Sequence, residues 1–265
     1  MLSVIVAAFD FIWQRWTKRR EERKQISALY VNPFLLACEE LQSRLYNILH
    51  LGGLGALRAE SQQERSYAPE TLYLIAQYFG WERHNFRYGP YAQDAEVFLR
   101  TEAIRATFAT DSVQVPKGTP AEEGQGVSED KAEPFRFFRY QQKALAQFIL
   151  QTSQGPAGWQ AETVPYLKFI KHHSTASASL PSVAATLAAL EQVGSGKSVR
   201  LDPIVLGRLA EVQNHLVMLL AYLEKKEDFT LFAGVRKPAT RIEDWEKWAE
   251  RQPWYRVLDE QAQST

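Results

Sequence analysis

Residues 70–86 read ETLYLIAQYFGWERHNF, and between Thr71 and Trp81 no side chain is charged. On a helical projection the apolar residues of this stretch point in every direction. One stripe consists of Leu72, Ile75, Ala76 and Phe79. The other faces carry Tyr73, Leu74, Tyr78 and Trp81. A helix that is apolar on all sides has no natural solvent face, so it belongs in the centre of a bundle. We therefore predict an all-α fold, in which an irregular multi-helix bundle surrounds a buried central helix at about residues 70–86.

Periodic apolar residues predict further helices on both sides of this segment. Before it, Asn32 as N-cap and Pro33 as the first helical residue predict a helix that ends at Gly52-Gly53. After it, helices are expected at Tyr91–Phe108, Phe135–Gln151, Pro165–His173, Pro181–Val193 and from Pro203 to Lys226. The sequence shows no convincing series of alternating strands.

Composition changes along the chain predict three regions. Residues 1–24 are expected to form an N-terminal amphipathic or membrane-anchoring helix, 25–228 the bundle, and 229–265 a tail with a short Trp-rich helix. Within the bundle, residues 112–133 hold two prolines, three glycines, an acidic excess and no aromatic residue. This composition predicts a long mobile loop.

The overall composition is that of a globular protein, with 45% hydrophobic and 23% charged residues among 265. The 31 basic and 31 acidic residues balance, but residues 15–24 hold six basic and two acidic side chains, a local charge of +4. Nucleic-acid binders usually spread basic charge over a broad face, so we expect no nucleic-acid partner. The single cysteine, Cys38, excludes an internal disulfide and is expected to be a small buried residue.

The N-terminal stretch MLSVIVAAFDFIWQRW carries apolar residues at spacings of three and four. The fifteen residues Leu2–Trp16 would cover only ~22 Å of helix, less than the ~30 Å of a bilayer core. Asp10 would also lie near mid-span, and a signal peptide would carry its positive charges before the apolar run. A helix lying in the membrane interface fits best, and docking on its own domain is the alternative. The residues expected to contact the membrane are Leu2, Ile5, Val6, Phe9, Trp13, Trp16, Arg15, Lys18, Arg19 and Arg20.

Five stretches together resemble a family of bacterial α-helical proteins to which no activity is attached. They are ELQSRLYNIL (40–49), TLYLIAQYFGWE (71–82), AIRATFATD (103–111), FRFFRYQQKAL (135–145) and VQNHLV (212–217). The resemblance implies a cytosolic helical domain, commonly behind an N-terminal membrane segment, and gives no catalytic residue. The apolar run at the N-terminus is shorter here than in that pattern, and a misplaced start codon is one explanation.

Several familiar chemical motifs are incomplete in this chain. Gly194–Ser198 reads GSGKS, but a phosphate-binding loop needs glycine at Glu191 and a preceding strand rather than a helix. His172 and His173 are adjacent, so on a helix they point about 100° apart and cannot easily share a metal ion. We expect no catalytic residue, no metal site and no cofactor.

Two groups of residues are candidates for binding. The first would form a polar network in the bundle or, alternatively, a ligand pocket near Tyr73, Gln77 and Trp81; it comprises Arg44, Asn47, Tyr73, Gln77, Tyr78 and Trp81. The second repeats at three and four on one helical face and could hold an acidic partner or lipid headgroups; it comprises Arg136, Arg139 and Lys143.

These patterns favour a non-enzymatic, membrane-associated helical protein whose main domain is cytoplasmic and acts through protein or lipid contacts. The alternative is a helical bundle that binds a small molecule or lipid. A membrane surface is the expected partner. The sequence identifies no protein partner and leaves homo-oligomerisation open.

Overall fold

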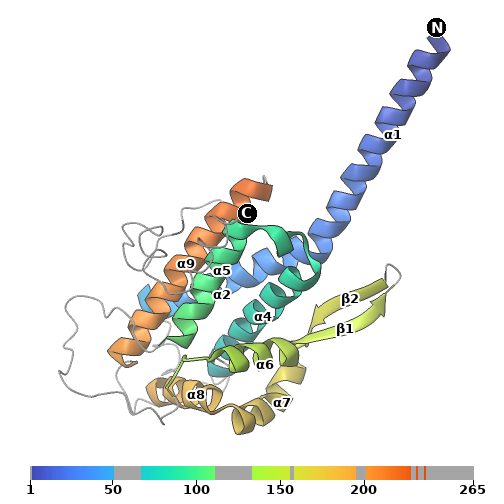
Figure 1. Ribbon diagram of the computed structural model, residues 1–265. Coiled ribbons are helices and arrows are strands. Elements are labelled where there is room, and N and C mark those ends of the chain that lie inside the picture. The colour runs from blue at the N-terminus through green and yellow to red at the C-terminus, as the bar shows by residue number, and fades with distance from the viewer. Residues whose placement is uncertain are drawn as a thin grey trace, which may run out of the picture.

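The computed structural model describes residues 2–50, 67–110, 133–155, 158–194 and 201–227, together with Leu231 and Arg236. Within these ranges the chain is helical apart from one two-stranded sheet (Figure 1), which confirms the predicted all-α fold. The elements are α1 (Leu2–Ile26), the π-helical turn η1 (Ser27–Val31), α2 (Asn32–His50), α4 (Tyr67–Tyr88), the 3-10 turn η3 (Pro90–Gln93), α5 (Ala95–Ala109), α6 (Arg139–Ile149), β1 (Leu150–Gly155), β2 (Gly158–Thr163), α7 (Tyr166–Ser179), α8 (Pro181–Gly194) and α9 (Pro203–Glu227).

Helix α4 is the buried central helix that the uncharged stretch predicts. It packs against α2, α6, α7 and α8 (Figure 1). Leu72, Ile75 and Ala76 are fully buried along one stripe of the helix, and Tyr78 is fully buried on another face. The helix ends at Tyr88, immediately before the Gly-Pro pair, as predicted.

A close approach at Gly80 fixes the end of α6 against α4. A Cβ atom at this position would lie 2.6 Å from Cγ2 of Ile149 and 2.9 Å from Cγ of Leu150. These distances leave no room for a side chain, so the absence of a Cβ lets the two segments touch. As a consequence, the C-terminal end of α6 is held close to α4 at Gly80.

Helix α2 begins at Asn32, next to the predicted start, but the predicted N-cap role of Asn32 is wrong because α1, η1 and α2 form one continuous helical run. Asn32 has helical dihedrals (φ −61°, ψ −46°), and its N–H donates to the carbonyl of Ser27, the spacing of a π-helix. Pro33 has no N–H to donate one turn back, so the helix accommodates it with a π-helical turn rather than a break. The chain bends at η1, where α1 leaves the body (Figure 1).

The β1–β2 hairpin was not predicted. Its strands pair antiparallel from Leu150↔Thr163 to Gly155↔Gly158, and Val164 N–H extends the pairing by donating to Ile149 O at 2.8 Å. The side chains of residues 151–154 are all exposed, so neither face of β1 shows the apolar alternation by which strands are recognised. Helix α6 accordingly ends at Ile149, before the hairpin begins.

Helix α9 is the one helix in the described ranges that is long and apolar enough to cross a membrane, judged by length and composition alone. Its most apolar window is 67% buried inside the protein, against α2 and α5. It therefore serves as a core helix of the bundle.

Three predictions fall outside the described residues. These are the mobile loop at 112–133 apart from Glu133, most of the GSGKS segment, and the Trp-rich tail. The buried position of Cys38, with no exposed surface, is confirmed, and burial raises the pKa of its thiol well above the ordinary value.

Candidate functional site

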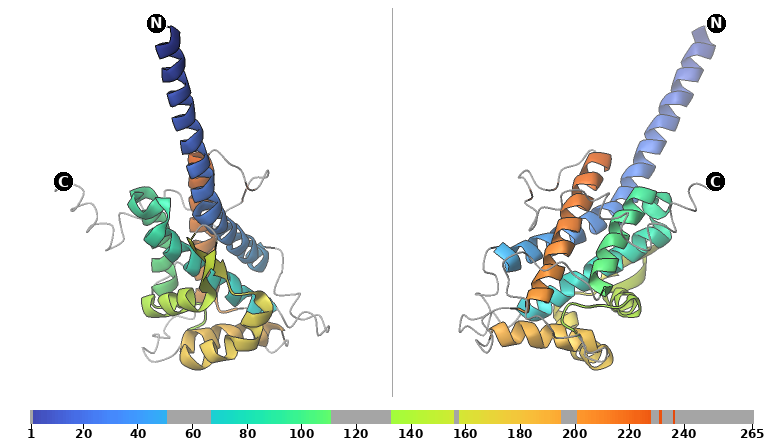
Figure 2. Two further views of the ribbon diagram at one scale, coloured as in Figure 1. Left: turned by 90° about the vertical axis from the view of Figure 1, so that its right-hand side faces the viewer. Right: turned by 60° about the vertical axis from the view of Figure 1, so that its left-hand side comes forward.

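Helix α1 projects away from the rest of the protein (Figure 2) and does not dock on its own domain. Trp13 and Trp16 are 56% and 51% exposed, with ring centroids 5.6 Å apart. The Arg20 guanidinium lies 5.5 Å from the Trp16 ring centroid. Four of the residues predicted to contact a membrane are exposed cations beside this aromatic pair, namely Arg15, Lys18, Arg19 and Arg20. The side chains of the predicted contacts Leu2, Ile5, Val6 and Phe9 lie outside the described part of the structure.

The direction of α1 is set where η1 meets α4. The Tyr30 ring stacks on His84 with centroids 5.3 Å apart, and the Asn85 amide donates to the Tyr30 carbonyl at 3.0 Å. Val31 is buried, and partial burial lowers the pKa of His84. These contacts tie the base of α1 to the central helix and leave its distal part free of the body.

The six residues proposed as a polar network or pocket on α2 and α4 do not share one cavity. Arg44 forms an ion pair with Glu70, with 2.5 Å between Nη2 and Oε2, and its guanidinium lies 4.1 Å from the Tyr67 ring centroid. Asn47 is only partly buried. None of the six lines the pocket described below.

The α4 members of that group have separate surroundings. Tyr73 donates its hydroxyl to Val164 O at 2.9 Å and packs edge-on against Phe169. Tyr78 and Gln77 each have a buried oxygen without a hydrogen-bond partner among the described residues, and Trp81 packs edge-on against the His84 ring. The network is therefore not fully satisfied, and Tyr78 is held mainly by aromatic packing.

Arg136, Arg139 and Lys143 do not form one helical face, so this prediction is wrong. Phe135 adopts a left-handed conformation (φ 58°), and α6 begins only at Arg139. Arg136 therefore precedes the helix and is 8% exposed. Arg139 is partly buried and paired with Glu102, and Lys143 is the exposed member of the three and lines a cavity.

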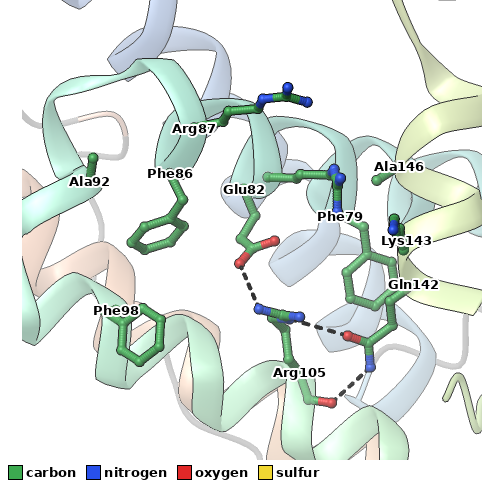
Figure 3. Close-up of a pocket in the computed structure, with 11 residues that line it drawn as sticks. Phe79, Glu82, Phe86, Arg87, Ala92, Phe98, Arg105, Gln142, Lys143 and Ala146 are labelled. Atoms are coloured by element: carbon green, nitrogen blue, oxygen red, sulfur yellow. Dashed lines mark hydrogen bonds and ion pairs between the residues drawn. The ribbon is translucent and has the colours of Figure 1, made fainter. Parts of the chain in front are cut away.

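That cavity is a pocket of about 390 Å³ lined by α4, η3, α5 and α6 (Figure 3). Its apolar wall is provided by Phe79, Phe86 and Phe98, and the last two rings meet edge-on at 5.8 Å. Phe86 and Phe98 lie on one side of the Glu82–Arg105 pair, and Phe79 lies on the other (Figure 3).

Arg105 lies at the polar centre of the pocket. Its Nη1 is 3.6 Å from Glu82 and 3.5 Å from Glu102, and its Nε donates to Gln142 Oε1 at 3.4 Å. The Gln142 amide in turn donates to the backbone carbonyls of Arg105 and Phe137, each at 2.8 Å. The guanidinium is thus held by both α5 and α6 before any ligand binds.

Glu82 is 6% exposed at the pocket wall. Burial raises the pKa of its carboxyl to about 7. The nearby Arg105 guanidinium lowers this pKa, the Glu102 carboxylate raises it, and the positive charges of Arg139 and Arg83 lower it by smaller amounts. The carboxyl therefore keeps its proton to a higher pH than an exposed glutamate does.

The mouth of the pocket is basic. Arg83, Arg87 and Lys143 belong to the pocket lining, and none of them forms an ion pair within 4.0 Å of a carboxylate in the described part of the chain; the Arg87 guanidinium lies 5.1 Å from the Tyr88 ring centroid. With Arg105, the lining contains four basic side chains and a single acidic one, Glu82.

Comparisons with family models, curated proteins and solved structures gave no match. The family resemblance of the five sequence stretches therefore stays a prediction.

Proposed function

We propose that this chain is a non-enzymatic protein held at the cytosolic face of a membrane by α1, and that it acts there through protein or lipid contacts. The observation that carries this proposal is the projection of α1 away from the body (Figure 1), with Trp13 and Trp16 exposed on it. Large exposed aromatic residues on a protruding helix are costly in water and are favoured at the membrane interface.

The charges beside these rings support attachment to an anionic surface. Arg15, Lys18, Arg19 and Arg20 are exposed, and each is worth about 1 kcal/mol close to an anionic leaflet. Basic residues next to a membrane helix favour the cytosolic side, so the bundle would lie in the cytoplasm. Because η1 and α4 hold the base of α1, its outer part can enter the headgroup layer without any change in the bundle.

Vesicle flotation tests this proposal. The full chain should float with vesicles containing anionic lipid, and it should float less as salt rises, because salt screens the basic residues. A Trp13→Ser/Trp16→Ser double variant should lose most of the floating fraction.

The matched control is Leu167→Ser, which removes a 74% exposed apolar side chain from α7 in the body. This variant should float like the unchanged chain. Equal loss in both variants, or no flotation of the unchanged chain, would show that α1 is not the anchor.

A further inference from the structure

We propose that the pocket between α4, α5 and α6 binds a small amphipathic anion, in which an acidic head group is joined to a short apolar chain or ring. This inference goes beyond membrane attachment, because the pocket lies on the bundle and includes no residue of α1. It rests on charge, shape and preorganisation in the described residues.

The charge of the lining selects an anion. Arg83 and Arg87 come from α4 and Lys143 from α6, and no described carboxylate pairs with any of them. Glu82 faces Arg105 and also interacts with Arg83, but one carboxyl against four basic side chains leaves the lining with an excess of positive charge. Three long cationic side chains that line one pocket can donate charge-assisted hydrogen bonds to a single phosphate, sulfate or carboxylate group.

The shape of the lining selects an apolar group next to that head. Phe79 is buried and Phe86 is partly buried, while Phe98 is 37% exposed and closes one side. An inorganic anion would leave the exposed parts of Phe86 and Phe98 in water, whereas a short chain or ring would cover them. The volume of about 390 Å³ is at the lower end of ligand pockets, which favours a short apolar group over a full lipid tail.

The pocket is also formed in advance. Gln142 fixes Arg105 through both ends of its amide, and the missing side chain of Gly80 holds α6 close to α4. Binding of a ligand therefore requires little ordering of Arg105 and Gln142. Its affinity depends mainly on Arg83, Arg87 and Lys143 and on the phenylalanine rings.

Titration calorimetry on the full chain tests this inference without any membrane. Octyl sulfate, kept below its micelle concentration, is the probe, because its charge does not titrate near neutral pH. Inorganic sulfate has the head group alone, and octyl glucoside has the chain with a neutral head. Octyl sulfate should bind at least tenfold more tightly than either. Equal binding of octyl glucoside or of inorganic sulfate would overturn the proposal, as would no binding of octyl sulfate.

Variants of two basic residues of the pocket lining, called the rim variants, show where octyl sulfate binds. Arg87→Gln and Lys143→Gln change exposed side chains, so the fold should be preserved, and each should weaken octyl sulfate binding about tenfold. Lys168→Gln, an exposed cation on α7, is the matched control and should leave the affinity unchanged. Equal affinities of the rim and control variants would place the binding elsewhere and would refute the inference.

Vesicles then distinguish two sources of the same ligand chemistry. If anionic vesicles lower the binding of octyl sulfate more than neutral vesicles do, the natural ligand is a lipid headgroup. If the two kinds of vesicle act equally, the ligand is a free amphipathic anion. Failure of flotation through α1 would leave the calorimetric result intact, so the two proposals fail separately.

Discussion

Replacing Arg208 by methionine is expected to destabilise the protein by about 3 kcal/mol, because the change removes a fully buried guanidinium from the partly buried Glu133 carboxylate and leaves that carboxylate with the more distant Arg136, at 3.7 Å. Arg208 lies on α9 with no exposed surface. Its Nη1 is 2.6 Å from Glu133 Oε1, and its Nη2 donates to the Thr110 carbonyl at 2.9 Å. Thr110 and Glu133 are the described residues on either side of residues 111–132, so a single guanidinium joins both ends of that segment.

Urea unfolding measures this effect. Arg208→Met should lower the midpoint without changing the dependence on urea, and Arg19→Met, an exposed arginine on α1, should leave it unchanged. Adding Glu133→Gln to Arg208→Met should recover part of the loss, because it removes a carboxylate that has lost its nearer partner and keeps only the 3.7 Å pairing with Arg136 among the described residues. A loss below about 1 kcal/mol for Arg208→Met would mean that this buried pair does not hold the two ends together.

Glu82→Gln is expected to stabilise the protein at alkaline pH by about 3 kcal/mol and to have little effect below pH 4.5. Burial raises the pKa of this carboxyl from 4.5 to about 7 in the folded protein. Its contribution to stability is therefore fully present below about pH 4.5 and is lost as the pH rises from there through 7, because the unfolded chain releases this proton more readily than the folded protein does. Glutamine resembles the protonated acid and cannot ionise.

The free energy of unfolding should be measured for both proteins between pH 5 and pH 8.5. The difference should grow as the pH rises, whereas Glu162→Gln, an exposed residue on β2, should give a difference that does not depend on pH. If the difference for Glu82→Gln does not change with pH, the carboxyl is ionised throughout and the assigned pKa is wrong.

The central helix could be predicted because its signal is local. An uncharged run from Thr71 to Trp81 can only be buried, and Gly89-Pro90 marks its end. The predicted N-cap role of Asn32 is wrong because the same Asn-Pro pair that begins a helix can lie inside a helical run when a π-helical turn accommodates the proline. Phe135 interrupts the predicted helix from Phe135 to Gln151: its conformation is left-handed, and its N–H donates to the hydroxyl of Thr186, which lies far along the chain.

The pocket could not be predicted because Glu82, Arg105 and Gln142 meet only through the packing of three helices. One local signal was present. Glu82 continues the buried spacing of Ile75 and Phe79, so a charged residue stands where the pattern expects an apolar one. Such a position marks a buried titratable group, but its partners lie beyond what periodicity can show.

The central claim, that α1 lies in a membrane interface, is tested most directly by environment-sensitive fluorophores attached at Trp16→Cys and at Gln14→Cys. The two positions are about 200° apart on the helix. Cys38 is fully buried, so it should not take up the label in the folded protein. On addition of anionic vesicles, the emission at position 16 should shift to the blue, whereas the label at position 14 should stay open to quenching by iodide. Burial of both labels would indicate a spanning helix, and no change at either position would contradict membrane attachment through α1.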